Sequence, residues 1–431
     1  MAAEVGIGIR GTCALAALVV LGLVVPLSSG AADAGTATIR VRSSSQFEAA
    51  VRALRKTGGT IKLRRHDYGG ELVVGARSVR PLRIVGEPGV RVESLLLERT
   101  QHVYVSRVTI APMGADAWLR VIGSRHVDVH DVLVTAKGTR FRATLQILES
   151  RHVAIRGSEF RHCGDRSQLF SNCLHLKHGT RHIRIVDNWF HDCRGCDFVH
   201  GLFGYDLTLR GNRFERALPC RTGRERCRHQ DLVSFWSGDR LLVDGNWFGV
   251  YRRGAAQLYL IRGVDRVSIV NNVFRGTDPR VPGYHARVAI IVGSKGSKRV
   301  PRRVRIVNNT ILTGARRIDG YAGSIRMSGV YWGLQRRKRP LLANNIIGLV
   351  QDPHHVCSVT AQAIGNVVLR GIACRGQNRV GDVHLDPRGR PTAASKLLID
   401  RGRRGFRVRR DIDGRKRDSR PDIGAYEYRG R

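Results

Sequence analysis

One ten-residue phrase recurs in this chain and limits what it can fold into. The phrase reads RHIRIVDNWF from residue 181, and it returns as YDLTLRGNRF from 205, DRLLVDGNWF from 239 and DRVSIVNNVF from 265. In each copy, apolar residues stand five and three positions before the asparagine and two positions after it. Two further asparagines downstream have a similar apolar pattern around them. The six asparagines are Asn188, Asn212, Asn246, Asn272, Asn309 and Asn345.

The spacing within and between the phrases predicts a stacked array of β-strands. Apolar residues at every second position are typical of a half-buried strand, and repeats 24 to 37 residues apart indicate stacked units. The same frame extends upstream without the asparagine, for example at Val153, Ile155 and Phe160, which gives at least nine units. Each unit is too small to bury its own apolar face, so its neighbours must cover that face.

The recurring asparagine is expected at the turn that ends each strand. Asparagine tolerates the left-handed backbone of a sharp bend, and stacked side-chain amides can hydrogen-bond along a ladder. Helical repeats are excluded because the apolar spacing is two rather than three and four. A propeller is excluded because a blade of four strands needs roughly 40–45 residues. The phrase therefore predicts one wall and one corner of a parallel coil.

On these residues the chain resembles the right-handed parallel β-helix proteins of the pectate-lyase-like superfamily. The resemblance implies an all-β fold, a single solenoid over residues 35–428, and carbohydrate handling as a functional class. The calcium cluster of the pectate lyases and the acidic triad of the polygalacturonases are not found in the sequence. The segment HQDLVS is similar to an HxDxxQ segment of bacterial relatives, with Ser234 where glutamine is usual. The resemblance therefore assigns no catalytic role to any residue.

Both ends of the solenoid carry expected closing segments. Within residues 35–70, Ser45 and Glu48 have the spacing of a capping box, and the apolar residues that follow would share one face of a helix. Such a helix can cover the open end of the stack, which a solenoid requires. Residues 376–428, which contain DIDGRKRDSRPDIGAYEY, are similar to the closing segment of many bacterial β-helix proteins and predict a turn-rich end.

Residues 1–34 predict a secretory signal peptide. Arg10 precedes the apolar run CALAALVVLGLVVPL, and small residues follow up to Ala34, where cleavage is expected. The run is short for a membrane span, and no second stretch approaches the roughly 20 apolar residues that a spanning helix needs. We therefore expect a secreted, extracellular bacterial protein with no stable membrane span after processing. A retained N-terminal anchor is the alternative.

The net charge of +39 at pH 7 bears on partners rather than on fold. An exported protein rarely meets nucleic acid, so the expected partner is an acidic polysaccharide or a cell-wall polymer, and no nucleic acid. The alternative is compositional drift, because most of the basic residues are arginine, as a GC-rich genome would produce. The sequence predicts neither the oligomeric state nor the natural substrate.

Eight cysteines remain after Cys13 leaves with the signal peptide. An even number in an oxidising compartment favours disulfides, and a zinc site at CRGC is the alternative. Two of the cysteines follow equivalent positions of adjacent repeats by five residues, and stacked backbones lie about 4.8 Å apart, within the Cα separation that a disulfide tolerates. The expected pairs are Cys163–Cys193, Cys173–Cys196, Cys220–Cys227 and Cys357–Cys374.

Function is expected outside the packed interior, on an outer face or in loops. The strand before each phrase is unusually polar, and one residue in each is placed inward: Leu174, Val199, Val233, Leu258, Val288 and Ile325. The next residue then points outward each time and forms a row: His175, His200, Ser234, Tyr259, Ala289 and Arg326. The longest insertions follow this face and can wall a groove for an extended polymer, in which aromatic side chains would stack on sugar rings.

Two reactions suit these residue types, and the first is β-elimination. A base removes the proton next to a uronate carboxylate, whose charge an arginine or another cation must neutralise. The expected base is His175, His200 or Lys177. A lysine needs its pKa lowered by burial or by neighbouring cations, whereas a histidine needs no such shift. Tyr259 is the expected acid, and the expected substrate-binding residues are His229, Trp236, Arg287 and Arg326.

The second reaction is hydrolysis, in which two carboxyl groups do the work. Asp197 and Asp231, on adjacent coils, are the outward acidic pair of this face. The same residues could bind Ca²⁺ together with Asn172, although the surrounding positive charge argues against it, and no other cofactor or metal is expected. The leading hypothesis is a polysaccharide lyase acting on an acidic glycan. The alternatives are a glycoside hydrolase and a non-catalytic glycan- or wall-binding protein.

Overall fold

The protein is described from a computed structural model, and residues 1–34, the expected signal peptide, lie outside the described residues. Within the part described, no helix is long and apolar enough to cross a membrane. The described residues are 37–113, 118–135, 143–163, 171–193, 196–202, 204–217, 231–249, 256–275, 288–293, 301–312, 325–327, 340–350, 362–371 and 378–430.

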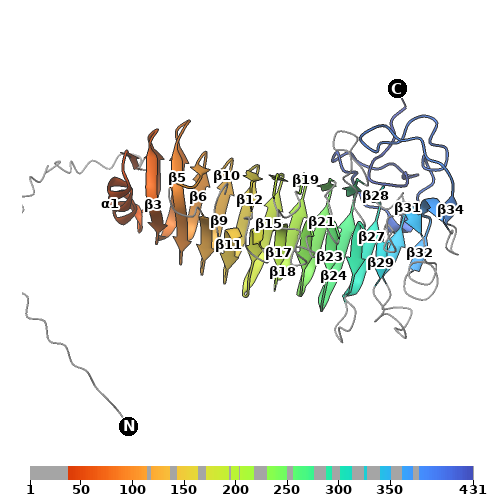
Figure 1. Ribbon diagram of the computed structural model, residues 1–431, viewed down its shortest axis with the longest axis horizontal. Helices are drawn as coiled ribbons and strands as arrows, with labels where there is room; N and C mark the ends of the chain where they lie inside the picture. The colour runs from red at the N-terminus through yellow and green to blue at the C-terminus, as the bar shows by residue number, and fades with distance from the viewer. Residues whose placement is uncertain are drawn as a thin grey trace, which may run out of the picture. The chain divides into compact units, whose positions relative to one another are not determined.

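The described residues form two large sheets in which each strand pairs in parallel with the equivalent strand of the next coil (Figure 1). The chain is a parallel β-helix, as the repeat predicts. Sheet A has 13 strands within the described residues. In stacking order they are β1 (Thr38–Val41), β2 (Gly59–Leu63), β4 (Arg77–Gly86), β6 (Gln101–Ser106), β9 (Arg125–His130), β12 (Arg151–Arg156), β15 (Thr180–Val186), β18 (Gly204–Arg210), β21 (Gly238–Asp244), β24 (Val264–Val270), β27 (Arg302–Val307), β30 (Leu341–Ala343) and β32 (Gln362–Ile364).

The second sheet, sheet B, has two faces that join at β3 (Asp67–Val74) and β5 (Arg91–Glu98), because β5 pairs with the first strand of both. Face B1 consists of β8 (Trp118–Ile122), β11 (Ala143–Leu148), β14 (Ser171–Leu176), β17 (Cys196–Gly201), β20 (Val233–Phe235), β23 (Leu258–Leu260), β26 (Ile290–Val292) and β29 (Ile325–Met327). Face B2 consists of β7 (Thr109–Ile110), β10 (Leu133–Thr135), β13 (Glu159–Arg161), β16 (Trp189–His191), β19 (Arg213–Glu215), β22 (Trp247–Phe248), β25 (Val273–Phe274), β28 (Thr310–Ile311), β31 (Ile346–Val350), β33 (Val367–Gly371) and β34 (Arg379–Val380).

The core lies inside the coil and is built from the alternate apolar positions of the phrase. Ile183, Leu207, Leu241 and Val267 face one another in successive strands of sheet A, in the register that the sequence predicts. The phenylalanines at one equivalent position of face B2 are fully buried, and their rings stack at centroid separations of 4.5 to 5.1 Å. Burial of each such ring stabilises the fold by roughly 2–3 kcal/mol. The stacked rings are those of Phe160, Phe190, Phe214, Phe248 and Phe274.

The asparagines form the ladder that the sequence predicts, at the corner between sheet A and face B2. Asn246 shows the pattern: its Oδ1 accepts from the backbone N and from Nδ2 of Asn212, and its Nδ2 donates to Leu209 O and to Asn272 Oδ1, at 2.9 to 3.0 Å. The column is longer than the phrase indicated, because two further members continue it. In order it contains Asn188, Asn212, Asn246, Asn272, Asn309, Asn345, Asn366 and Asn378.

The left-handed backbone of this corner lies one residue earlier than expected. Asp187 has φ 55° and Gly211 has φ 64°, and each immediately precedes a ladder asparagine. None of the eight ladder asparagines takes a positive φ. The expectation that the asparagine itself adopts the bend is therefore wrong. The side-chain hydrogen bonds give the asparagine the same geometry in every coil, and the residue before it, with its positive φ, makes the turn.

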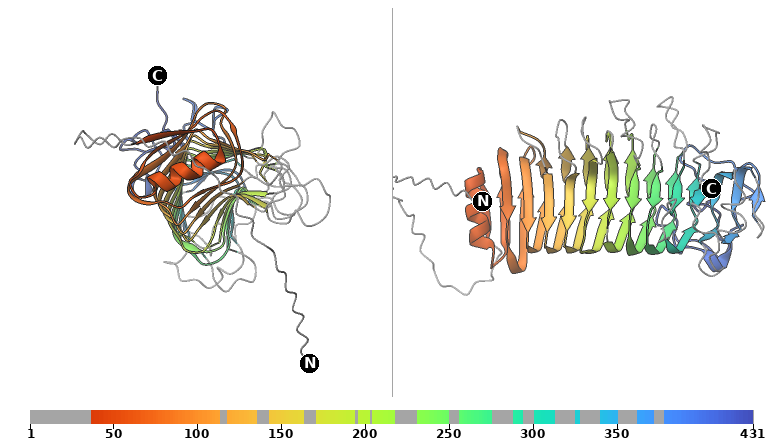
Figure 2. Two further views of the ribbon diagram at one scale, coloured as in Figure 1. Left: turned by 90° about the vertical axis from the view of Figure 1, so that its left-hand side faces the viewer. Right: turned by 60° about the horizontal axis from the view of Figure 1, so that its bottom comes forward.

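Helix α1 (Ser44–Leu54) packs against β1, β2 and β3 and lies across the N-terminal end of the coils (Figure 2). Its buried face contains Phe47, Ala50, Val51 and Leu54. The N-cap is Ser43, whose Oγ accepts from Gln46 N at 3.2 Å, so the expected capping box at Ser45 and Glu48 begins two residues too late.

The C-terminal segment 378–430, which includes the 3₁₀ helix η5 (Arg404–Phe406), lies along the corner turns of the later coils. Nδ2 atoms of Asn271, Asn308 and Asn344 donate to backbone carbonyls of Arg410, Asp422 and Arg403, at 2.8 to 3.1 Å. Inside the segment, a buried ion pair joins Arg417 to Glu427 at 2.8 Å. The segment thus closes the flank of the coil by satisfying polar groups of the turns.

The expected cysteine pairing is corrected by the structure. Cys163 forms a disulfide with Cys173, ten residues later, at a Cα separation of 5.0 Å. The pairs Cys163–Cys193 and Cys173–Cys196 are therefore wrong, although Cys193 is also disulfide-bonded. The bridge closes the loop between faces B2 and B1 within one coil rather than linking two coils. The side chain of Cys196 and the expected pairs Cys220–Cys227 and Cys357–Cys374 lie outside the described residues.

Candidate functional site

The expected polar row exists on the outer side of face B1. His175, His200, Ser234 and Tyr259 occupy paired positions in β14, β17, β20 and β23. The row is shifted by two residues in β26, because Leu258 pairs with Ile290 and Tyr259 pairs with Ile291. Ile291 therefore replaces Ala289 as the row member, and Val288 is not the inward residue of that strand. The next member is Arg326, which pairs with Ile291.

His200 is held by two groups at a single ring nitrogen. Ser234 Oγ donates to Asp197 Oδ2 at 2.7 Å, and the same Oγ lies 2.7 Å from His200 Nδ1, while Asp197 Oδ2 lies 3.3 Å from Nδ1. Because the hydroxyl proton is used on the carboxylate, Nδ1 must donate to Ser234. This fixes the tautomer, and His200 Nε2 is left as the basic nitrogen. Nε2 makes no hydrogen bond within the described part of the chain.

His175 lies beside His200 but differs from it chemically. The two rings meet edge to face with centroids 5.2 Å apart, and His175 Nε2 is buried without a hydrogen-bond partner. Burial, followed by the nearby His200 and Lys177, lowers the pKa of His175 to about 3. His175 is therefore neutral across the physiological range, and a base with so low a pKa accepts a proton poorly.

An exposed aromatic ring and a cation flank His200. Trp236 is 37% exposed, and its ring centroid lies 6.2 Å from that of His200. The guanidinium of Arg262 sits 5.3 Å above the Trp236 ring. Arg262 is exposed and makes no ion pair within the described residues, so its N–H groups are free to bind an anion while its plane stays stacked.

Asp197 and Asp231 are joined in a short carboxylate ladder rather than exposed as a pair. Asp197 Oδ1 accepts from Asp231 N, and Asp231 Oδ1 accepts from Ala256 N, both at 2.9 Å. Asp231 is only 4% exposed, because it stands two residues before the inward Val233, and alternate residues of a strand point to the same side. Burial and the charge of Asp197 raise the pKa of Asp231 well above its ordinary value. The expectation of an outward acidic pair is therefore corrected.

The carboxylate ladder also bears on the expected calcium site. Asn172, at the equivalent position one coil earlier, is buried. The two oxygens of Asp197 accept from a backbone N–H and from a hydroxyl group, so a calcium ion would have to share these oxygens with both donors. Among the described residues, no group of three or more His, Cys, Asp or Glu side chains is placed to hold a metal ion.

The remaining expected residues are placed as follows. Lys177, at the end of β14, is half-buried and lowers the pKa of His175. Tyr259 packs against Ala256, Val288 and Ile291 one coil beyond Ser234. Arg326 occupies a position in β29 four coils from His200 along the row, and its side chain lies outside the described residues. His229 and Arg287 lie outside the described residues.

The structure adds residues that the sequence interpretation missed. The row extends past His175 to Gln146 in β11 and Arg120 in β8. Both are found by continuing the same offset from the inward Leu145 and Leu119. Arg262 could not be found in this way, because it lies in the turn after β23 and its relation to Trp236 depends on stacking between coils.

Comparisons with known proteins show likeness at the level of fold only. No protein-family model and no curated protein matches the chain. Among solved structures, it is similar to pectate lyase Pel9A, with 14% identity over 92% of this chain and 98% of that chain, at a TM-score of 0.47. It is also similar to PfbA, a surface adhesin of Streptococcus pneumoniae, with 11% identity over 82% and 91% of the two chains and a TM-score of 0.42. At such identities the neighbours do not identify an activity.

Proposed function

We propose that the protein is a secreted polysaccharide lyase that cleaves an acidic, uronate-containing glycan by β-elimination on face B1, with His200 as the base. The observation that carries the proposal is the hydrogen bonding of His200. Asp197 and Ser234 hold Nδ1 in its protonated form, which leaves Nε2 with the lone pair needed to take a proton. Such fixing of one ring nitrogen is typical of a histidine base.

The reaction follows from these residues. His200 Nε2 takes the proton from the carbon next to the uronate carboxylate, and the freed electron pair forms a carbon–carbon double bond. The glycosidic carbon–oxygen bond breaks at the same time, and the leaving oxygen takes up a proton, a role assigned to Tyr259. No oxidant or reductant is required. The products are an unsaturated uronate end and a new reducing end.

Arg262 and Trp236 supply the recognition. The negative charge that develops on the uronate during proton removal must be stabilised, and a guanidinium does so with paired N–H donors. Trp236 offers an exposed ring beside His200 on which a sugar can stack. The excess of basic residues over the whole chain raises the local concentration of an acidic polymer.

The test is an absorbance assay near 235 nm on a panel of acidic glycans, including polygalacturonate and alginate, with and without a chelator. The wild-type protein is expected to produce absorbance with at least one glycan, and to retain it in chelator because Arg262 neutralises the carboxylate. His200→Ala should lower kcat by roughly 10²- to 10⁴-fold. Arg262→Gln should lower kcat/KM by about tenfold or more.

The matched control is His130→Ala, which removes a partly exposed histidine from sheet A. That variant should keep wild-type activity. New reducing ends without absorbance would show hydrolysis and overturn the elimination chemistry. Full activity in His200→Ala would overturn the assignment of the base.

A further inference from the structure

Sheet A carries a column of four stacked histidines that the proposed reaction does not use. His102, His126, His152 and His182 occupy equivalent positions in β6, β9, β12 and β15, each just before an inward apolar residue. Successive ring centroids are 5.0, 4.8 and 4.6 Å apart, and the last two pairs are nearly parallel. In the sequence these histidines stand in the tripeptides QHV, RHV, RHV and RHI.

The backbone explains why the rings stand in line. All four histidines take left-handed conformations with φ between 53° and 56°, which residues with a Cβ adopt only where the surrounding structure holds them. His102 Nδ1 lies 3.0 Å from Ser78 O at one end of the column. At the other end, His182 Nδ1 lies 3.3 Å from Asp206 Oδ2. The column is thus bounded at both ends and regular between them.

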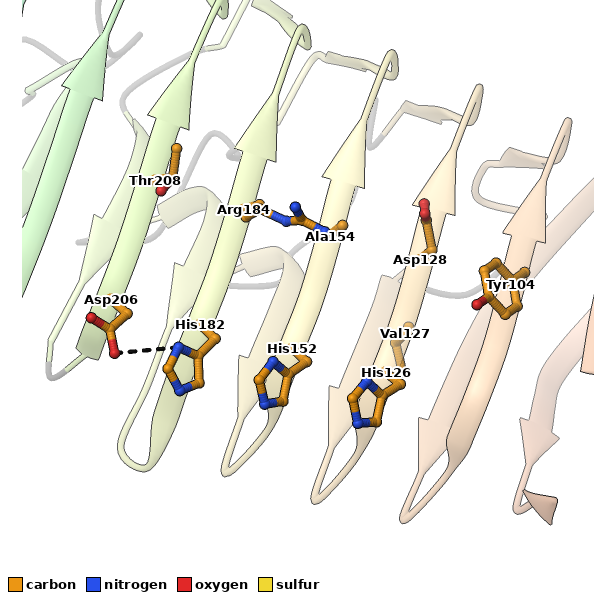
Figure 3. Close-up of a pocket in the computed structure, with 10 residues that line it drawn as sticks. All are labelled: Tyr104, His126, Val127, Asp128, His152, Ala154, His182, Arg184, Asp206 and Thr208. Atoms are coloured by element: carbon orange, nitrogen blue, oxygen red, sulfur yellow. Dashed lines mark ion pairs between the residues drawn. The ribbon is translucent and has the colours of Figure 1, made fainter. Parts of the chain in front are cut away.

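The last three histidines line one side of a cavity of about 490 Å³ on the outer surface of sheet A (Figure 3). The next outward row lies beside them and changes in size from coil to coil, with small side chains at Ala154 and Thr208. Figure 3 shows the side chain of Arg184 extending toward Ala154. Small residues among larger ones leave the hollow, and Tyr104 and Asp128 complete that row.

The charges around the column are mostly positive. The carboxylates of the cavity already have cationic or histidine partners: Asp128 pairs with Arg156 at 2.9 Å, and Asp206 pairs with Arg240 and with His182 at the end of the column. The cations near the rings are Arg125, Arg151, Arg181 and Arg184, of which Arg181 lies 5.3 Å over the Tyr205 ring. Arg184 is exposed and makes no ion pair within the described residues.

A metal ion does not suit this column. Imidazole nitrogens bind a metal along a lone pair in the ring plane, at about 2.0–2.1 Å. Parallel rings at 4.6 to 4.8 Å point those lone pairs in the same direction, so neighbouring nitrogens do not converge on one ion. The arrangement instead presents one nitrogen edge per coil to whatever lies in the cavity.

We propose that His126, His152, His182 and Arg184 form an anion-binding strip that holds an acidic polysaccharide laid across the coils, and that binds it more tightly as the pH falls. The strip repeats once per coil, about every 4.8 Å, close to the length of one sugar residue in an extended chain. Successive carboxylates of a polyuronate can therefore meet successive cationic edges. The strip is on a different sheet from the face B1 site, and the proposal does not depend on the reaction there.

Proton uptake follows from the same geometry. In the free protein, burial and the charges of neighbouring histidines and arginines lower the pKa values of His126 and His152, so these rings are neutral near pH 7. A bound carboxylate would stabilise their charged forms and raise those pKa values. By linkage, binding takes up protons, and lower pH must strengthen binding. Arginine contacts add affinity that does not depend on pH in this range.

The test measures binding of a polygalacturonate fragment of about ten residues at about pH 5 and pH 8, at fixed ionic strength, by isothermal titration calorimetry. All proteins carry His200→Ala, so that the probe is not cleaved. The triple change His126→Asn, His152→Asn and His182→Asn keeps residues that tolerate the left-handed backbone. It is expected to weaken binding about tenfold at pH 5 and less than about twofold at pH 8. Arg184→Gln should weaken binding a few-fold at both pH values.

His66→Asn is the matched control, because it removes an exposed histidine outside the column, and it should bind as the parent does. A neutral dextran of equal length should not bind through the strip. The same affinity in the triple variant and its parent at pH 5, with equal melting temperatures, would overturn the proposal. A triple variant that lost dextran binding as strongly as polygalacturonate binding would also overturn it, because the strip would then not recognise charge. The triple change in a chain that retains His200 should leave lyase activity on a short substrate unchanged, which separates this test from that of the reaction.

Discussion

Two columns of equivalent positions run along this solenoid, and they differ in almost every physical respect. The asparagine ladder repeats one residue type in successive coils, is buried, and uses each amide as donor and acceptor. Within the described residues, the row on face B1 repeats a residue type in successive coils only at His175 and His200, and both histidines are partly exposed. It also leaves His175 Nε2 buried without a partner.

The difference shows what repetition means in a stacked fold. A side-chain ladder works only if each member finds the same group one coil above and below, so a structural column must be uniform. A column with no such requirement can vary, and it can hold groups with different chemical roles side by side. Variation in a stack of otherwise uniform rows therefore marks a candidate site, and the histidine column of sheet A is intermediate, because it is uniform but exposed.

The largest expected effect is in the uniform column. Asn246→Ala removes a side chain whose amide makes five hydrogen bonds. The backbone N–H of Asn212 loses its acceptor, and the carbonyl of Leu209 loses this donor. We expect the free energy of unfolding to fall by about 4 kcal/mol, since each unsatisfied buried group costs roughly 1–3 kcal/mol. Urea unfolding followed by circular dichroism measures the change.

Two controls sharpen this comparison. Asn378→Ala, at the part-buried end of the ladder, should cost about 1–2 kcal/mol. Ser234→Ala, in the variable row, removes one buried hydroxyl and should cost about 1 kcal/mol, because its two partners, His200 Nδ1 and Asp197 Oδ2, lie 3.3 Å apart and can pair directly. Equal losses for Asn246→Ala and Ser234→Ala would mean that the two columns do not differ in structural role.

The uniform column could be predicted from the sequence because two independent signals agree there. The period-two apolar pattern sets the strand, and the asparagine marks the corner, so the register of Ile183, Leu207 and Leu241 followed directly. The local backbone did not follow. A preference of asparagine for left-handed φ pointed to the ladder residue itself, whereas hydrogen bonding of its side chain requires the preceding residue, such as Asp187, to make the bend.

The row on face B1 could be predicted only in part, because the apolar pattern leaves the register of one strand open and does not determine contacts between coils. In β26 several consecutive residues are apolar, so a shift of two residues from Val288 to Ile290 leaves the pattern unchanged. Asp231 has inward parity, and only the structure shows that a backbone N–H from the next coil holds its carboxylate. Cys163 bonds to Cys173 within its own coil, and the strand repeat does not determine which of the nearby cysteines pair.

The second prediction concerns acid stability and the unpartnered histidine of the row. Because the pKa of His175 is lowered to about 3 in the folded protein from roughly 6.5 in the unfolded chain, the unfolded chain binds more protons between these values. Stability is therefore complete above about pH 6.5 and falls as the pH drops toward 3. His175→Gln, which copies Gln146 of the preceding coil, removes this loss.

We expect His175→Gln to be more stable than the wild-type protein by about 2 kcal/mol at pH 4, allowing for partial exposure of the ring. At pH 8 the two proteins should differ by no more than about 1 kcal/mol. Urea unfolding at both pH values is the measurement. Parallel pH profiles for the two proteins would show that His175 is protonated as readily when folded as when unfolded, and that burial does not govern its charge.

The smallest expected effect lies where the two kinds of column meet, at the carboxylate ladder beneath the site. Asp231→Asn keeps an oxygen to accept from Ala256 N and places the residue type of Asn172 in the same column. Because burial and Asp197 raise the pKa of Asp231, the wild-type protein loses stability as the pH rises through that raised value, and the variant should not. The free energy of unfolding at pH 4 should be unchanged within about 1 kcal/mol, and the variant should be the more stable at pH 8.

The activity of Asp231→Asn, measured by absorbance, should stay within a few-fold of wild type, because a buried carboxylate that acts only as a structural acceptor has no part in proton transfer. If Asp231→Asn instead abolishes turnover while folding normally, the raised pKa belongs to a general acid, and the catalytic site includes the buried carboxylate ladder. Uniform and variable columns would then not separate structural residues from catalytic ones.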